Sequence, residues 1–416
     1  MEIREEYDLI VIGGGAAGFF GAINYAELAK APKKILILES GTQFLRKVKI
    51  SGGGRCNVTT SITDPKELIK NYPRGGRSLL YGFYEFGPQQ MVLWLENKKV
   101  KLKTENDGRI FPITNSSQTI IDKFYELTDR YNIQKITRAK VVRVKKDEDM
   151  FEIKCQNETT FLSKHLLIST GSSTAGFELI KQFGHQVTPL VPSLFTFNLK
   201  NNPYTELSGV SLQNATVDLH AGKYKLSETG PLLMTHKGLS GPVILKISSV
   251  AARELKQSNY HAKIRIRPFM DKKEKEIRDE LNRLKRESPE KMPSNLPIFG
   301  LPKKLWKFYL ETADFNYTNY KSIQEKGINR LIETIQNRFD EIIGKNTFKE
   351  EFVTCGGVDL KQVDLKTFES NLINRLFFAG EVLDVDAVTG GFNFQNAWTS
   401  SFLAARKMAS KEGSEA

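Results

Sequence analysis

The sequence predicts an α/β fold in which both ends of the chain build one domain and the middle of the chain is inserted into it. Near the start, a buried-strand pattern over residues 7–12 runs into a glycine-rich turn, a helical stretch and a second strand over 34–38. Near the end, residues 376–381 form a strand that ends in a turn, and residues 389–393 open a last helix. These two halves together predict a Rossmann-like domain.

The predicted secondary structure changes along the stretch between the two halves. Helical periodicity occurs around residues 120–131, and strands are expected over 141–145, 151–155 and 165–169. After about Pro189 the pattern becomes half-exposed strands, which we place at 215–220 and 262–267.

A helical part follows, beginning near Asp271 with Ile277, Leu281 and Leu284 on one face. A proline-containing stretch over 289–302 leads into further helical patterns that we expect to last until about Ile343, and strand character resumes near Glu351. We therefore predict a Rossmann-like domain of residues 1–190 plus 350–416, an inserted β-rich subdomain of 191–268, and an inserted helical, basic subdomain of 269–349.

Composition excludes several classes of protein. No run of about 18 apolar residues occurs, and the first six residues include three glutamates where a signal peptide would have basic residues followed by an apolar core, so we expect a cytoplasmic protein with no membrane partner. The three cysteines lie far apart without a C-x-x-C pair, and none of the five histidines forms H-E-x-x-H. We therefore expect no disulfide framework and no metal site. No feature selects an oligomeric state.

The positive charge is concentrated in one segment. The chain carries a net charge of +13, of which +7 falls in residues 254–310, with 15 Lys and Arg against 8 Asp and Glu. A polyanionic partner such as RNA and a merely solvated surface both explain this excess. Phe299, Trp306, Phe308 and Tyr309 lie among basic residues there, which suits either base stacking or a helical core. The basic residues that we expect to contact RNA are Arg283, Lys285, Arg286, Lys303, Lys304 and Lys307.

The glycine-rich turn after the first strand is a dinucleotide fingerprint. Gly13, Gly15 and Gly18 form G-x-G-x-x-G between a strand and a helix, a spacing that permits a tight turn and close approach of phosphates to a helix N-terminus. Glu39 follows Gly18 by 21 residues, at the end of the next strand, where a carboxylate accepts hydrogen bonds from ribose hydroxyls. An adenine dinucleotide is the expected ligand.

A second glycine-rich loop runs from Ser51 to Asn57 and follows Arg46 and Lys47. Such a loop offers backbone amides and positive charge to phosphates or to an electron-rich ring, although the pattern also suits a surface turn.

The run from Arg46 to Asn57 resembles the K-x-x-x-S-G-G-G-R-C-N element of the YhiN/BaiN-like (aminoacetone-oxidase-like) flavoproteins, a family of FAD-dependent oxidoreductases. Four more stretches resemble this family in the same order: residues 108–112, 235–242, 353–358, and 379–386 continuing through 391–398. The resemblance covers nearly the whole chain and implies one FAD-binding domain interrupted by a β-rich and a helical insertion.

The resemblance also implies which residues bind FAD. The ADP half would be held by the first glycine turn and Glu39, the adenine would be lined by Val141 and Val142, and the flavin ring would be flanked by the second loop and the start of the last helix. The implied residues are Gly13, Gly15, Ala16, Ala17, Gly18, Glu39, Ser40, Lys47, Ser51, Gly52, Gly53, Arg55, Cys56, Asn57, Val141, Val142, Thr170, Gly171, Gly380, Glu381, Gly390, Gly391, Phe392 and Asn393. Because no second G-x-G-x-x-G follows a strand, NAD(P)H, the expected electron donor, would dock transiently over the flavin.

Three residues are candidates for catalysis. Cys56 could donate a proton beside the flavin, or it could be a small buried residue packed under the ring, and the same two alternatives hold for Cys355 in its glycine-rich turn. His236 could orient the substrate or serve as a hydrogen-bonded structural residue.

Members of the resembled family reduce conjugated C=C bonds, in steroid-type enones and in a uridine of 23S ribosomal RNA, which gives dihydrouridine. Both reactions add hydride β to a carbonyl and a proton at the α carbon. The basic insertion favours the RNA substrate over a small enone such as a bile-acid intermediate. A flavoprotein oxidase, or a flavoprotein without a catalytic role, is the alternative class.

Overall fold

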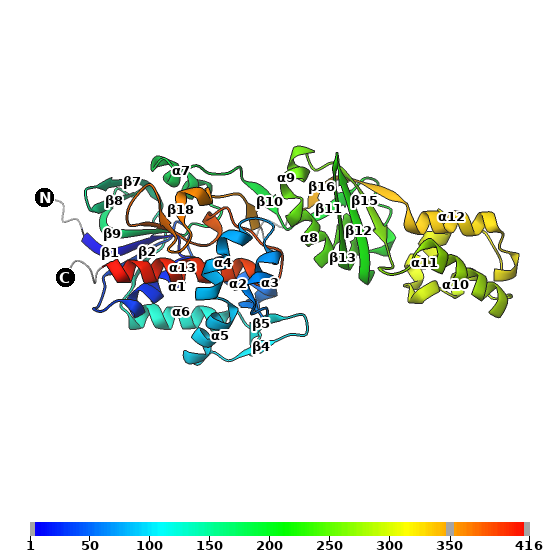
Figure 1. Ribbon diagram of the computed structural model, residues 1–416, viewed down its shortest axis with the longest axis horizontal. Coiled ribbons are helices and arrows are strands. Elements are labelled where there is room, and N and C mark those ends of the chain that lie inside the picture. The colour runs from blue at the N-terminus through cyan, green and yellow to red at the C-terminus, as the bar shows by residue number, and fades with distance from the viewer. Residues whose placement is uncertain (1–4, 347–352, 412–416) are drawn as a thin grey trace. The chain divides into compact units, whose positions relative to one another are not determined.

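The computed structural model describes residues 5–346 and 353–411, which contacts divide into two compact units (Figure 1). The first unit consists of Met1–Pro192 and Lys349–Ala416, and the second of Ser193–Phe348. Both chain ends therefore belong to the first unit, and the second unit is formed by one continuous stretch of chain.

The first unit is built on one mixed sheet with the strand order β18-β19-β20-β9-β1-β2-β6, to which the hairpin β7–β8 is added through β8 and β9. The central strands β1, β2, β6, β9 and β20 are parallel. Their bounds and those of the flanking strands are β1 Glu5–Ile12, β2 Ile35–Leu38, β6 Gln134–Ile136, β7 Val141–Asp147, β8 Met150–Cys155, β9 Thr160–Ile168, β18 Val363–Asp364, β19 Glu369–Ser370 and β20 Leu376–Phe378.

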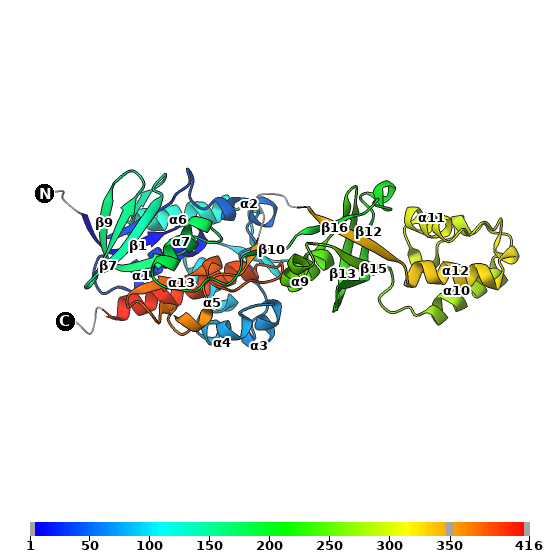
Figure 2. The ribbon, with the colours of Figure 1, turned by 90° about the horizontal axis from the view of Figure 1, so that it is seen from above.

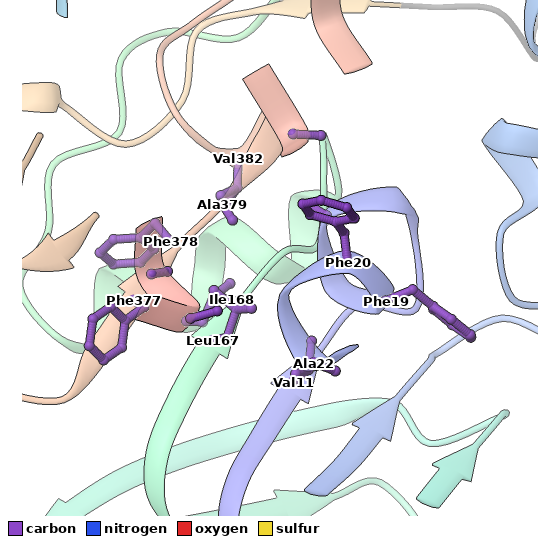
Figure 3. Packing of buried hydrophobic residues seen from close by; sticks show 14 of the residues in the cluster. Val11, Phe19, Phe20, Ala22, Leu167, Ile168, Phe377, Phe378, Ala379 and Val382 are labelled. Carbon is purple, nitrogen blue, oxygen red and sulfur yellow. The ribbon is translucent and has the colours of Figure 1, made fainter. Parts of the chain in front are cut away.

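Apolar residues fill both faces of these central strands, as expected for a parallel sheet covered on both sides. Val11, Leu167 and Phe377 lie on three neighbouring strands and are completely buried. Figure 3 shows how Phe19 and Phe20 from the first helix join this cluster. The pairing of β20 with β9 places a strand from the C-terminal end of the chain inside the sheet that begins at the N-terminus.

The first and last helices, α1 (Ala16–Leu28) and α13 (Phe392–Lys411), pack along each other (Figure 1). The other helices of the unit are α2 Arg46–Gly54, α3 Pro65–Leu68, α4 Gly76–Glu85, α5 Pro88–Asn97, α6 Gln118–Arg130 and α7 Thr174–Gln182. The remaining strands are β3 Thr59–Thr60, β4 Leu102–Thr104 and β5 Arg109–Pro112, which form a small sheet of order β3-β5-β4, and β10 Val191–Ser193, which pairs with β17 Val353–Cys355.

The second unit contains a closed barrel with the strand order β11-β14-β13-β12-β15-β16. Its strands are β11 Thr196–Leu199, β12 Ser211–Ala221, β13 Tyr224–Thr235, β14 Gly238–Ser240, β15 Ala262–Arg267 and β16 Phe339–Asn346. Helices α8 Pro242–Val250 and α9 Ala252–Gln257 connect β14 to β15.

Three amphipathic helices lie between β15 and β16, grouped together in Figure 2: α10 Glu274–Glu287, α11 Lys303–Thr312 and α12 Glu325–Gln336. Ile277, Leu281 and Leu284 are buried on one face of α10, as the sequence predicts. The three helices are thus inserted between β15 and β16, two strands that pair with each other in the barrel.

The prediction that helical structure continues to about Ile343 is wrong, because residues 339–346 form β16, which pairs with β11 and β15. Asp340 and Ile342 point inward, and the exposed side chains alternate with them. The buried Asp340 accepts hydrogen bonds from Tyr204 and Arg338, so a charged residue occupies a core position and hides the strand alternation. The predicted strand near Glu351 lies partly outside the described residues, and β17 begins at Val353.

The predicted α/β fold class is confirmed by this arrangement. In the part of the chain that the structure describes, no helix is both long and apolar enough to cross a membrane.

Candidate cofactor-binding site

The first glycine turn connects the parallel strand β1 to α1. An added Cβ at Gly18 would lie 2.1 Å from the carbonyl oxygen of Gly13 and 2.8 Å from Oγ of Ser169. Ser169 Oγ in turn donates to the carbonyl of Gly13 at 2.9 Å. Only glycine permits this close packing of the helix on the turn, which is the role expected of the third glycine in the fingerprint.

Gly15, by contrast, faces open space. An ideal Cβ at Gly15 has no described heavy atom within 4 Å. The helix that follows starts at Ala16, runs on through Ala17, and has no side-chain hydrogen bond at its N-cap. The N-terminus of a 13-residue helix therefore presents its backbone amides with room beside them. This is where the pyrophosphate of a dinucleotide would fit.

Glu39 follows β2 at the same edge of the sheet. Its Oε2 accepts from the amide of Gly14 at 2.9 Å, and its Oε1 accepts from the amide of Gly41 at 2.7 Å and from Ser40 Oγ at 3.2 Å. The carboxylate is thus fixed against the glycine turn, with lone pairs left for ribose hydroxyls.

The predicted adenine residues lie in the same neighbourhood. The amide of Ala139, two residues before Val141, donates to the carbonyl of Glu39 at 2.9 Å. Val141 is buried, whereas Val142 is 41% exposed and available to a ligand.

The second glycine loop interrupts α2. Ser51 is extended, and Gly52, Gly53 and Gly54 follow with φ values of 56°, 68° and 80°. The left-handed run turns the chain so that Cβ positions on Gly53 and Gly54 face open space. Arg55 points toward the small sheet, where its guanidinium lies 2.6 Å from Glu105 and 4.0 Å from the ring centroid of Phe111.

The two segments predicted to flank the flavin contact each other. With its amide oriented to satisfy both sides, Asn57 donates to the carbonyls of Thr59 (3.0 Å) and Ile110 (3.3 Å) and accepts from the amide of Gly391 at 2.9 Å. An added Cβ at Gly391 would lie 2.7 Å from the carbonyl oxygen of Thr59. The loop that ends at Asn57 and the segment at Gly391, 334 positions apart in sequence, are therefore in direct contact.

Lys47 and Glu381 form a second link between the two chain ends. Lys47 Nζ lies 2.6 Å from Oε2 of Glu381, and Oε1 of Glu381 accepts from the amide of Thr354 at 3.2 Å. Gly171 lies beside the same carboxylate, since its Cβ would be 3.4 Å from Oε2. Gly380, the residue before Glu381, donates its amide to Ser400 Oγ at 2.9 Å.

These residues fit a bound dinucleotide. Within the described residues, Thr170 Oγ1 and Asn396 Oδ1 are buried without a hydrogen-bond partner. Thr170 is one of the predicted cofactor-binding residues, and the Asn396 side chain donates to the carbonyl of Gly380, which is another. These two are among seven such atoms in the described residues, and their place beside the predicted cofactor residues is compatible with a ligand or water that satisfies them.

The three catalytic candidates fall in two different units. Cys56 is completely buried with a left-handed backbone (φ 59°), and Cys355 is buried at the end of β17, both in the first unit. His236 is exposed in the turn between β13 and β14 of the second unit. The structure thus brings neither cysteine together with His236 in one unit, and the catalytic roles stay predictions.

Burial raises the pKa of the Cys56 thiol to about 12, against an ordinary value of 9.0. The unfolded chain ionises this thiol near pH 9 and the folded chain does not, so the stability present below pH 9 is lost as the pH rises toward 12. We expect Cys56 alone to lower the free energy of unfolding by about 1.4 kcal/mol at pH 10. Urea unfolding at pH 8 and pH 10 measures this, and the Cys56→Ala protein should lose less stability between the two. Equal losses in both proteins would contradict a protonated, buried thiol.

Sequence reasoning missed residues 71–74, which run against the segment that precedes α13. Arg74 pairs with the completely buried Asp386, and Tyr72 Oη donates to the carbonyl of Phe392 at 2.6 Å. The one signal available was an arginine followed by two glycines, Gly75 and Gly76, in a stretch without periodicity.

The predicted RNA-contacting cations divide into two groups. Arg283 pairs with Glu280 and Glu287, Lys285 donates to the carbonyl of Ile323, and Lys307 pairs with Glu311. The exposed members without an ion pair among residues 5–346 and 353–411 are Arg286, Lys303 and Lys304.

The aromatic residues divide as well. The stacking interpretation is wrong for Trp306 and Tyr309, which are buried in the core of the second unit because helical spacing turns them inward. Phe308 is partly buried, whereas Phe299 is 37% exposed.

Comparison with known proteins gives full-length matches. Residues 7–407 match the family described as the HI0933-like protein Rossmann domain. A ribosomal RNA dihydrouridine synthase of Haemophilus influenzae is 30% identical over 409 residues, which cover 95% of this chain and 97% of that protein. A 3-dehydro-bile acid delta(4,6)-reductase of Clostridium scindens is 26% identical over 412 residues, covering 96% and 98%.

Among solved structures, a 3-ketosteroid-delta4-(5alpha)-dehydrogenase from Rhodococcus jostii superposes with a TM-score of 0.53. The alignment covers 98% of each chain at 12% sequence identity, so this likeness shows a shared fold.

Proposed function

Because this chain belongs to the HI0933-like Rossmann-domain family, we propose that it is an FAD-dependent reductase of carbonyl-conjugated C=C bonds, and that its acceptor is a uridine of 23S ribosomal RNA. The predicted family and the enzyme class, an FAD-dependent oxidoreductase, are confirmed. The acceptor, the electron donor and the roles of individual residues belong to the proposal.

FAD, when bound, supplies the hydride chemistry for such a reduction. The first glycine turn and Glu39 would hold the ADP half, and the loop of residues 51–57 with the start of α13 would hold the flavin. The α13 amides, near Gly391, would stabilise negative charge on the reduced ring. NAD(P)H is the proposed donor.

The reduction needs a proton at the α carbon after hydride adds at the β carbon. Cys56 keeps its proton at neutral pH, since burial raises its pKa to about 12. A buried thiol has no exposed path to a substrate, so the geometry favours the role of Cys56 as a packing residue. Cys355 is equally buried, so the same argument holds for it, and we propose water as the donor to be tested first, with Cys355→Ala as the comparison.

The observation that carries the RNA substrate is the full-length similarity to the two ribosomal RNA dihydrouridine synthases, of Haemophilus influenzae at 30% and Escherichia coli at 29% identity. The match includes the inserted unit, which carries the +7 segment of residues 254–310. A segment of this charge favours a polyanion over a bile-acid-sized molecule.

A small enone is the second candidate, favoured by the similarity to the bile-acid reductase at 26% identity. Anaerobic photoreduction of the flavoprotein followed by mixing with each acceptor separates the two. We expect unmodified ribosomal RNA to reoxidise the flavin and to gain dihydrouridine. Reoxidation by an enone alone would support the second candidate, and reoxidation by oxygen alone would indicate an oxidase.

We expect the protein to purify with one non-covalent FAD per chain, and Glu39→Ala to weaken FAD binding by about 1–3 kcal/mol through loss of a charged acceptor. Glu39 also accepts from the amides of Gly14 and Gly41, so the stability of the apoprotein is measured alongside FAD affinity. Glu39→Gln, which keeps one acceptor oxygen, should retain part of the affinity. A protein that takes up no FAD at all would contradict the proposal.

A further inference from the structure

A short strap of residues 71–76 runs against the segment that leads into α13. Arg74 and Asp386 form an antiparallel bridge, and the amide of Val388 donates to the carbonyl of Asn71 at 3.0 Å. Tyr72 is buried, and its hydroxyl donates to the carbonyl of Phe392 at the first residue of α13. The strap therefore contacts both ends of residues 386–392.

The strongest contact in the strap is the Arg74–Asp386 pair. Nε and Nη2 of Arg74 donate to Oδ1 and Oδ2 of Asp386, which gives a two-pronged interaction with fixed geometry. The Asp386 side chain is completely buried, and the Arg74 side chain is 13% exposed. A pair held in this way fixes the backbone on both sides of it more rigidly than an exposed pair would.

The strap also approaches the loop more closely than a side chain would allow. An added Cβ at Gly75 (φ 72°) would lie 2.6 Å from Cγ2 of Val385 and 2.9 Å from the carbonyl oxygen of Asp384. Glycine is required at this position, because the left-handed backbone and the close approach both disfavour other residues.

The segment fixed by the strap is tied directly to the proposed flavin loop. Asn393 Oδ1 accepts from the amide of Ala387 at 3.1 Å, and its Nδ2 donates to the carbonyl of Ala387 at 3.2 Å. Ala387 follows Asp386, so the order of contacts is Arg74, Asp386, Ala387, Asn393. On the other side, Asn57 holds the amide of Gly391.

We propose that Arg74 is a positioning residue for the flavin: through Asp386 it fixes the loop whose amides, at Gly390–Asn393, would face the pyrimidine edge of the ring. This inference rests on the proposed FAD site. Amides held at that edge would stabilise the negative charge that the ring gains on reduction and so would raise its midpoint potential. A loop released from the strap would bind FAD less tightly and stabilise the reduced ring less.

Three variants and a matched control test the proposal: Arg74→Met, Asp386→Leu, the double variant, and Arg77→Met. Arg77 is an exposed arginine three residues along the same stretch, with no ion pair in the described part of the chain. Apoprotein melting temperature, FAD dissociation constant and flavin midpoint potential are measured for each.

Each single variant removes one member of the buried ion pair, so both should lower the apoprotein melting temperature. Both should also weaken FAD binding at least about tenfold, the size expected for loss of a charge-assisted hydrogen bond, and shift the midpoint potential to more negative values. The double variant removes both charges, so its melting temperature should recover while its FAD affinity and potential stay shifted. Arg77→Met should behave as wild type.

A double variant that recovers wild-type affinity and potential together with stability would overturn the inference and leave the pair a purely structural contact. A single variant with normal potential would overturn it equally. If the wild-type protein itself binds no FAD, the proposed function fails instead, and the two failures are thereby distinguished.

Discussion

Gly18→Ala is expected to lower the free energy of unfolding of the apoprotein by about 1–3 kcal/mol, the cost of forcing a group into a closely packed position. The added Cβ would lie 2.1 Å from the carbonyl oxygen of Gly13, a backbone atom that cannot rotate away. FAD affinity should fall as well, because the backbone must move to relieve this clash, and that movement displaces the turn that would hold the pyrophosphate. Urea unfolding of the apoprotein and fluorescence titration with FAD measure the two effects.

Gly15→Ala is the matched control for this substitution, because it makes the same chemical change three residues earlier in the same turn. Its Cβ would have no described atom within 4 Å, and the backbone φ of −91° suits any residue. The apoprotein should keep its stability, since alanine only reduces the freedom of the unfolded chain. FAD affinity should fall about tenfold or more, because the methyl group would occupy the space proposed for the phosphates. A Gly15→Ala protein that binds FAD normally would place the pyrophosphate elsewhere.

The sequence could predict those parts of the fold and of the candidate site that are determined by residues close together in the chain. The strand, glycine turn, helix and acid of residues 7–39 each carry a short-range signal, and the closing strand and last helix carry another. The structure places Glu39 against Gly14, and Asn57 against Gly391, so two loops predicted separately are in contact. The binding roles of these residues stay predictions.

The features that sequence missed depend on contacts between distant residues. Arg74 and Asp386 are 312 positions apart, and neither lies in a periodic stretch, so no local pattern reports their pairing. The sequence of β16 predicts a helix because Phe339, Ile342 and Ile343 have helical spacing, while the inward position between Phe339 and Ile342 is an aspartate. Only the partners of Asp340, which are Tyr204 and Arg338, explain why a charge occupies the core.

Local pairing also changes how the basic segment is interpreted. Counting charges treats Arg283 and Arg286 as equivalent, although the structure surrounds Arg283 with Glu280 and Glu287 and leaves Arg286 exposed. A cation already paired with carboxylates neutralises less phosphate charge, so fewer counterions leave the RNA and the cation contributes less to binding. Net charge alone therefore overstates the number of useful contacts.

Replacing Arg286, Lys303 and Lys304 together by Gln is accordingly expected to weaken binding of ribosomal RNA and to reduce its salt dependence. If each residue contacts one phosphate, the slope of log affinity against log salt should lose about one unit per residue. Affinity is measured from 50 to 200 mM salt, together with dihydrouridine formation. FAD content, and NAD(P)H oxidation with an artificial acceptor, should stay at wild-type values because all three residues lie in the second unit.

A second triple variant, Arg283, Lys307 and Arg330 to Gln, removes the same net charge from exposed cations that are paired with Glu280, Glu311 and Asp314, respectively. A general effect of net charge would weaken RNA binding equally in both triples, whereas direct phosphate contacts would weaken it more in the first. Melting curves of both proteins control for loss of helix stability. Salt-independent activity and unchanged RNA binding in a folded first triple would exclude these contacts and favour a small enone as the acceptor, because an uncharged substrate gains nothing from released counterions.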